Sequence, residues 1–182
     1  MLVAMTILTS VAVPAVSDYV EDAKLVRATN DVAVLSVSLF RVFNDVGFER
    51  TRPRGWDTYD LLVGAGAAPT VGGPGTEPWV TPQGAADVGL LDDQLLRNAA
   101  GYRPFRRRDL LGWRGAYLQQ PVGPDPWAHR YAVNVRAMRG VQTDTFVLSA
   151  GPDGIVVSPF EADGLSGAGD DIVSLVSSGV GQ

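Results

Sequence analysis

The sequence contains no cysteine, one histidine and one lysine. Without cysteine, the chain has no disulfides, thiolate metal sites or cysteine nucleophiles. A catalytic nucleophile would need His129 or Lys24 as its base, and neither residue lies in a recognisable catalytic motif. We therefore predict that the protein is not an enzyme and that His129 is an exposed turn residue.

Basic residues are also absent from the C-terminal part of the chain. Residues 140–182 contain no Lys or Arg, but they hold six acidic residues: Asp144, Asp153, Glu161, Asp163, Asp170 and Asp171. The net charge of the whole chain is −5, which argues against general nucleic-acid binding. The acidic region is either a solvated surface, the usual place for carboxylates, or a cation site.

The N-terminus has a long uncharged and mostly apolar stretch, MLVAMTILTSVAVPAV, which is slightly shorter than a membrane-spanning helix requires. No basic residue precedes Lys24, so the stretch fits a signal peptide poorly. Apolar residues then recur every three or four positions at Leu25, Val32, Leu35, Leu39 and Val42. This pattern predicts one helix from the start of the chain to about Val46, first apolar and then amphipathic.

Three turn-rich segments follow this helix. Residues 50–83 are rich in Gly and Pro and form either a surface insertion or a functional or mobile loop. The sequence GLLDDQLLRNAAGY predicts a short helix with Leu90, Leu91, Leu95 and Leu96 on its apolar face. A cluster of arginines, Arg103 and 106–108, is either a solvated turn or a contact for lipid headgroups or for an acidic patch on a neighbouring subunit.

The C-terminal region has strand patterns. Tyr131, Val133 and Val135 alternate as in a half-buried strand, and FVLSAGPDGIVV predicts a hairpin with its turn at Asp153. The segment GDDIVSLV closes the chain as a last strand or a short helix.

The N-terminal helix resembles that of type IV pilin-like proteins. The resemblance is carried by Val13-Pro14-Ala15, Asp18-Tyr19 and Ala23-Lys24. In that family a basic leader, a cleavage-site glycine and Phe-Thr-Leu-Ile-Glu would precede this stretch. We therefore expect Met1 to be an internal methionine or the chain to be truncated.

Two further segments resemble the major pseudopilins of type II secretion systems, which carry a WRGPYL run and then DPWG before a Tyr-bearing strand. Here these runs are Trp113-Arg114-Gly115-Ala116-Tyr117-Leu118 and Asp125-Pro126-Trp127-Ala128. Ala116 and Ala128 replace Pro and Gly of the family pattern, which places the local turn geometry in question.

The acidic end resembles the same family in its Ser149–Gly154 turn and in Gly169-Asp170-Asp171-Ile172. The resemblance implies a loop that binds calcium, with Asp153 and Asp171 as side-chain ligands and Asp170 next; Glu161 and Asp163 are weaker candidates. Calcium prefers several oxygen ligands from carboxylates and backbone carbonyls, which such a loop supplies. The loop lacks the Gly-Gly pair of the family, so its carbonyl ligands are not assigned.

The expected fold is α+β, with a long, partly transmembrane N-terminal helix packed on a small antiparallel β-sheet and a calcium-type C-terminal loop. We expect a transmembrane part at 1–17, an amphipathic helix at 18–48, a variable region with a short helix at 49–110, and the sheet with the acidic loop at 111–182.

The resemblance implies a structural subunit of a periplasmic pseudopilus for type II protein secretion. Its partners would be further copies in a homo-oligomeric filament, other pseudopilins and the inner-membrane assembly platform. It would cross the bacterial inner membrane once, with the globular domain in the periplasm. Two alternatives remain: a minor pilin-like subunit of a type IV pilus or uptake system, and a membrane-anchored binding module.

Overall fold

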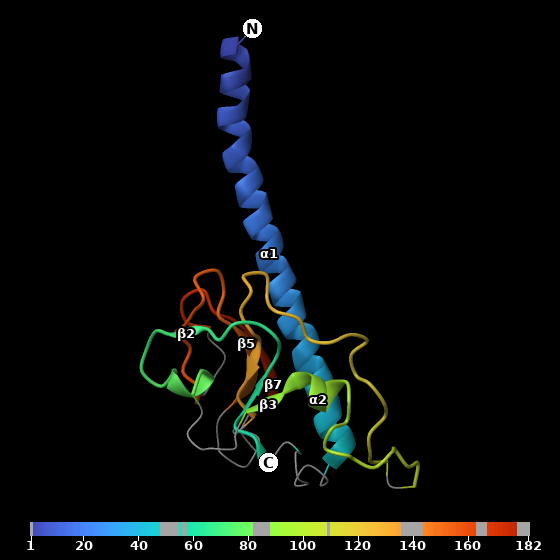
Figure 1. The fold of residues 1–182 in the computed structure, drawn as a ribbon. Coiled ribbons are helices and arrows are strands. Elements are labelled where there is room, and N and C mark those ends of the chain that lie inside the picture. Colours follow the sequence, from blue (N-terminus) through green and yellow to red (C-terminus); the bar gives the residue numbers. More distant parts are fainter. Residues whose placement is uncertain are drawn as a thin grey trace.

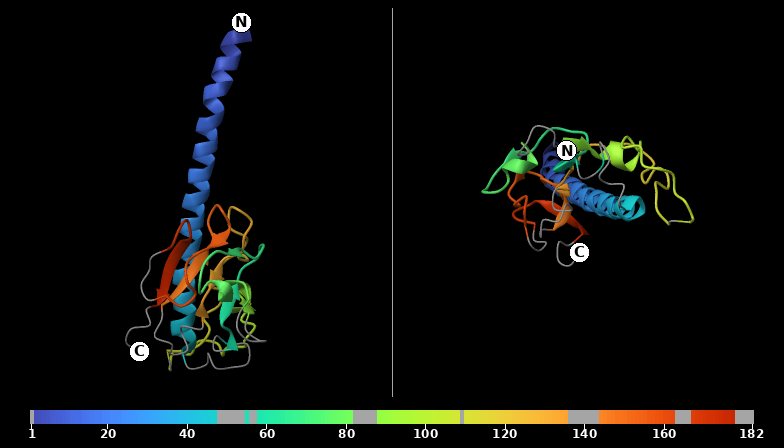
Figure 2. Two further views of the ribbon diagram at one scale, coloured as in Figure 1. Left: turned by 90° about the vertical axis from the view of Figure 1, so that its left-hand side faces the viewer. Right: turned by 90° about the horizontal axis from the view of Figure 1, so that it is seen from below.

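The computed structural model shows an α+β protein in which one long helix carries a small domain (Figure 1). It describes residues 2–47, 55, 58–81, 88–108, 110–135, 144–162 and 167–177, with side chains described from Val16 onward. Helix α1 spans Leu2–Val46, as the sequence predicts, and extends well beyond the domain (Figure 2). No helix in the described part of the chain is long and apolar enough to cross a membrane.

The main sheet has the strand order β3-β1-β4-β5-β7 among the described residues. Its strands are β1 (Leu61–Val63), β3 (Val88–Leu90), β4 (Ala132–Val133), β5 (Thr145–Ser149) and β7 (Ile172–Ser177). The pairs β1–β4, β4–β5 and β5–β7 are antiparallel, but β1 and β3 run parallel. The prediction of an antiparallel sheet is therefore wrong, and the sheet is mixed.

The predicted hairpin around Asp153 is also wrong. A turn follows β5, but the next strand, β6 (Ile155–Val156), leaves the main sheet and pairs in parallel with β2 (Thr70–Val71). Gly151 and Gly154 both have positive φ angles, of 65° and 67°, which L side chains rarely adopt. The chain thus crosses from one sheet to the other within this turn. The segment GDDIVSLV, by contrast, forms a strand (β7), one of the two predicted possibilities.

Helix α1 packs one face against the main sheet, mostly against β5 and β7. The buried stripe on this face consists of Ala28, Val32, Leu35, Leu39, Val42 and Val46. Four of the five predicted stripe residues are therefore buried. Leu25 is 38% exposed, because it lies where the helix leaves the domain. The short helix α2 (Leu91–Leu95) also contacts α1; it buries Leu91 and Leu95 but leaves Leu90 exposed.

A second apolar cluster covers the other face of the sheet. Trp79, from the 3₁₀ helix η3 (Glu77–Trp79), is completely buried there against Phe146 and Phe160, with ring centroids at 5.3 and 4.8 Å. The Gly/Pro-rich region thus supplies part of the core. Since the sheet is covered on both faces, residues 131–135 are all buried, and the prediction of a half-buried strand there is wrong.

Candidate cation site

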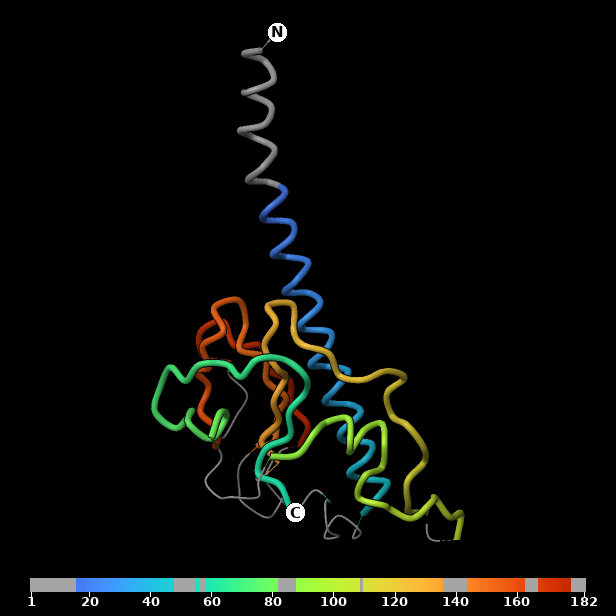
Figure 3. The backbone as a smooth tube through the Cα atoms, viewed as in Figure 1, coloured from blue at the N-terminus to red at the C-terminus, as the bar shows by residue number. Residues whose placement is uncertain are grey.

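The three predicted calcium ligands lie at one end of the main sheet. Strands β5 and β7 are antiparallel neighbours, with Ser149 opposite Ile172. The turn that follows β5 and the segment that precedes β7 must therefore meet. Figure 3 shows both segments, in orange and red, at the end of the domain from which α1 extends. Strand pairing thus brings Asp153 close to Asp170, with Asp171 next to Asp170 in the chain.

Asp171 is the most buried member of the group, with 8% of its surface exposed. Its Oδ2 accepts hydrogen bonds from the backbone N–H groups of Val157 and Ser158, at 3.0 and 2.6 Å. Its Oδ1 is buried and has no hydrogen-bond partner. Burial raises the pKa of Asp171, and the adjacent Asp170 adds to the rise, whereas hydrogen bonds from Ser158 and Val157 lower it. A cation beside Oδ1 would supply the missing partner.

Asp170 and Asp153 contact each other through the backbone. Asp170 Oδ2 accepts a hydrogen bond of 3.2 Å from the N–H of Asp153, and Asp153 Oδ1 accepts one of 2.7 Å from the N–H of Ile155. Among the described residues, however, no three acidic or histidine side chains converge as a metal-binding group. The structure therefore brings Asp153 and Asp170 into contact but does not gather all three predicted ligands around one point. Glu161 is exposed, and Asp163 lies outside the described residues.

Gly151 sets the geometry of this turn, and replacing it gives a first prediction. A Cβ atom at Gly151 would overlap the carbonyl oxygen of Asp170, and its φ of +65° disfavours any L side chain. We expect Gly151→Ala to lower the free energy of unfolding by about 2–3 kcal/mol in urea titrations. Gly123→Ala is the control, because a Cβ there meets open space, and should change it by under about 0.5 kcal/mol. If both variants lowered the free energy of unfolding equally, Gly151 would not have the proposed role in this turn.

The Trp-Arg-Gly segment anchors the C-terminal end of α1. Arg114 Nε lies 2.9 Å from Asp45 Oδ1, and the Tyr117 hydroxyl donates to Asp45 Oδ2 at 2.9 Å. Burial, together with this hydrogen bond to Asp45, raises the pKa of Tyr117 to about 12. Trp113 packs edge-on against Tyr117, with ring centroids 4.8 Å apart.

The Asp-Pro-Trp segment contacts α1 near the middle of the helix. Trp127 Nε1 donates to Glu21 Oε2 at 3.2 Å, and Lys24 lies 2.8 Å from the other oxygen of Glu21. Asp125, which sequence reasoning did not single out as a functional carboxylate, is 3% exposed and fixes the turn itself. His129 is partly buried, not an exposed turn residue, because its ring packs over Gly154.

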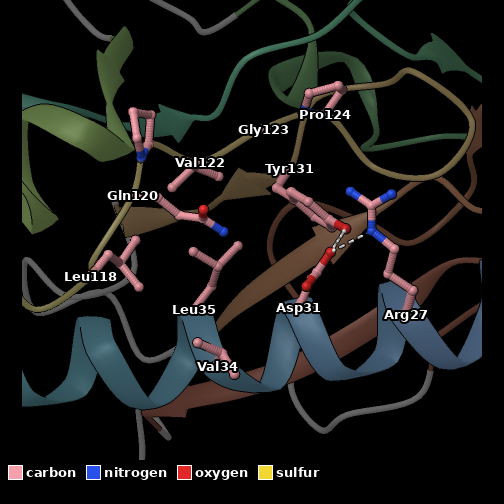
Figure 4. A pocket seen from close by; sticks show the side chains of 11 residues that line it. Arg27, Asp31, Val34, Leu35, Leu118, Gln120, Val122, Gly123, Pro124 and Tyr131 are labelled. Carbon is pink, nitrogen blue, oxygen red and sulfur yellow. Dashed lines mark hydrogen bonds and ion pairs between the residues drawn. The ribbon is translucent and has the colours of Figure 1, made fainter.

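A cleft of about 410 Å³ lies between α1 and residues 118–124 (Figure 4). Its walls are polar and apolar in equal part, and one end holds Asp31, which accepts a 2.9 Å hydrogen bond from the Tyr131 hydroxyl and lies 3.5 Å from Arg27 Nε. Burial and the hydrogen bond to Asp31 raise the pKa of Tyr131, so this hydroxyl stays protonated. A cleft of this mixed lining can hold a group that has an apolar part and a polar end.

No protein-family model, curated protein or solved structure matches the chain.

Proposed function

We propose that the protein is a structural subunit of the major-pseudopilin type, which is anchored in the bacterial inner membrane by the start of α1 and assembles into a periplasmic pseudopilus for type II secretion. The observation that carries this proposal is the construction of α1. One side of the helix is held by the domain, and its opposite side is exposed and carries apolar side chains, including Tyr19, Val26, Val37 and Phe40. Exposed apolar surface of this extent is typical of protein or membrane contacts.

The motif segments support the same function. The Trp-Arg-Gly and Asp-Pro-Trp segments both hold α1 to the domain, through Asp45 and Glu21. A subunit whose helix packs in a filament needs its domain fixed to that helix.

Calcium is part of the proposal. Asp171 and Asp170, before β7, and Asp153, after β5, would hold the ion. It would neutralise carboxylates that otherwise repel each other. The unpartnered Oδ1 of Asp171 supports a hard cation at this place. The ion would link the two segments that flank the β5–β7 pair.

Electron microscopy of sheared filaments tests the proposed assembly. The chain, joined behind the leader and first residues of a known major pseudopilin, is produced together with a type II assembly platform. We expect filaments that contain the chain as their main component. If the known pseudopilin forms filaments in the same cells and this chain stays dispersed in the membrane, the proposed function is wrong.

The cleft of Figure 4 favours a second candidate function, a membrane-anchored binding module. A cleft with apolar side chains and one ion pair at its end suits a peptide side chain or a small ligand with a polar group. A chain that never forms filaments but loses ligand capture on Val122→Asp would favour this candidate.

A further inference from the structure

Exposed residues on the outward face of α1 recur at the same three- and four-residue steps as the buried residues on its inward face. Nine exposed positions alternate at steps of three and four residues: Val16, Tyr19, Ala23, Val26, Asn30, Ala33, Val37, Phe40 and Asn44. We call these nine positions the outer seam. Exposed fractions of 75% at Tyr19, 61% at Val26 and 49% at Phe40 show that the domain does not cover it.

This spacing is that of a coiled coil. Apolar residues at alternating three- and four-residue steps form the a and d positions of a heptad, which pack into a facing helix. The outer seam holds Val16, Ala23, Asn30, Val37 and Asn44 at a, and Tyr19, Val26, Ala33 and Phe40 at d. The pattern runs through four heptads, the length at which a coiled-coil assignment becomes reasonable.

The polar residues of the seam indicate what covers it. Asn30 and Asn44 both occupy a positions, where a single polar residue fixes the register of paired helices. In a parallel, in-register pair of identical helices, Asn30 faces Asn30 and Asn44 faces Asn44. An antiparallel or shifted pair would instead place these amides against apolar side chains, which costs free energy.

The charged residues beside the outer seam also favour a parallel, in-register pair. Asp22 lies at a g position and Arg27 at the e position five residues later, both exposed. This is the spacing at which g and e residues form ion pairs between parallel helices. Arg27 Nε also lies 3.5 Å from Asp31 of its own helix, and its five N–H donors suffice for both carboxylates.

We propose that the outer seam pairs, in parallel and in register, with the outer seam of a second copy of this chain. The pairing deepens the proposed function, and it rests on that function in taking the two chains as anchored side by side in one membrane. Alanine and asparagine at four of the nine positions limit the apolar area that the pair buries, so membrane anchoring would supply the effective concentration that the pair needs.

Disulfide cross-linking of the full chain in membranes tests this pair cleanly, because the chain has no cysteine of its own. Ala33→Cys introduces a thiol on the seam, and Leu25→Cys introduces one at an exposed position of the same helix off the seam. Under mild oxidation we expect the Ala33→Cys variant to form covalent dimers at least about tenfold faster than the Leu25→Cys variant, since a disulfide needs closely spaced Cβ atoms. Equal rates would overturn the proposal.

Two further variants separate pairing from folding and from filament assembly. Phe40→Glu places a charge on the seam without touching the core and should abolish the Ala33→Cys cross-link while leaving the unfolding transition unchanged. A mixture of Ala33→Cys and Phe40→Cys chains that cross-links to each other faster than either cross-links to itself would show a shifted register and overturn the proposal. Filaments without the in-register cross-link would leave the proposed function intact, and the cross-link without filaments would leave the pairing intact.

Discussion

Replacing Trp79 with alanine is expected to lower the free energy of unfolding by about 3–5 kcal/mol, the usual cost of removing a buried tryptophan. The side chain is completely buried between Phe146 and Phe160, and its Nε1 donates a 3.0 Å hydrogen bond to the carbonyl oxygen of Ser158. Truncation would leave both a cavity and an unpaired carbonyl group. Urea titration of the full chain in detergent, followed by circular dichroism, measures the change.

Trp127→Ala is the matched control for this prediction. Trp127 is only partly buried, and its indole makes one exposed hydrogen bond, to Glu21. We expect its replacement to cost under about 1 kcal/mol. Losses of the same size at both tryptophans would contradict the assignment of Trp79 to the core. Because Ser158 also donates its backbone N–H to Asp171, the loss of Trp79 should weaken the candidate cation site as well.

Replacing Asp125 with alanine is expected to cost about 3 kcal/mol or more, because one buried carboxylate satisfies three donors. Oδ1 accepts from the N–H groups of Trp127 and His129 at 3.0 and 2.8 Å, and Oδ2 accepts from the Ser149 hydroxyl at 2.7 Å. Without the carboxylate, these donors would remain buried without their partner. Thermal or urea unfolding of the full chain measures the loss.

Asp125→Asn separates the loss of charge from the loss of the hydrogen bonds. The amide oxygen can still accept from both N–H groups, and the Ser149 hydroxyl can rotate to accept from the amide nitrogen. We expect a loss of under about half that of the alanine variant. If Asn and Ala destabilise the chain equally, the negative charge and not the hydrogen-bond geometry holds this turn.

The sequence predicted those parts of the fold that have a clear period. The three- and four-residue spacing of Val32, Leu35, Leu39 and Val42 is a local signal, and all four residues are buried. It does not show where the domain ends along the helix, and Leu25, the first residue of the predicted stripe, is exposed.

Short strands carry no such signal. Strands β2, β4 and β6 have two residues each, too few to show an alternation, and their partners lie far away in the sequence. The parallel pairings of β1 with β3 and of β2 with β6 therefore could not be predicted from local sequence patterns. The burial of Trp79 depends on the same long-range contacts, so its Gly/Pro-rich surroundings indicated a loop on the surface.

The candidate site was accessible to sequence reasoning only in part. Resemblance selected Asp153, Asp170 and Asp171, and strand pairing in the structure accounts for their proximity. The unpartnered oxygen of Asp171 depends on how residues 157 and 158 pass over it, and that arrangement follows from the β2–β6 pair, which the sequence did not indicate.

Calcium provides the most direct test of the proposal that this chain is a subunit of the major-pseudopilin type, because the acidic site is its most specific chemical feature. The measurement is thermal unfolding of the full chain in detergent, with calcium, with magnesium and with a chelator. At about 100 times its dissociation constant, a ligand of the native state adds about 2.7 kcal/mol, or about 5–10 °C in Tm for a chain of this size. We expect this rise with calcium, its loss in Asp171→Asn and its retention in the exposed control Glu77→Gln. No rise with calcium, or an equal rise in Asp171→Asn, would contradict the account.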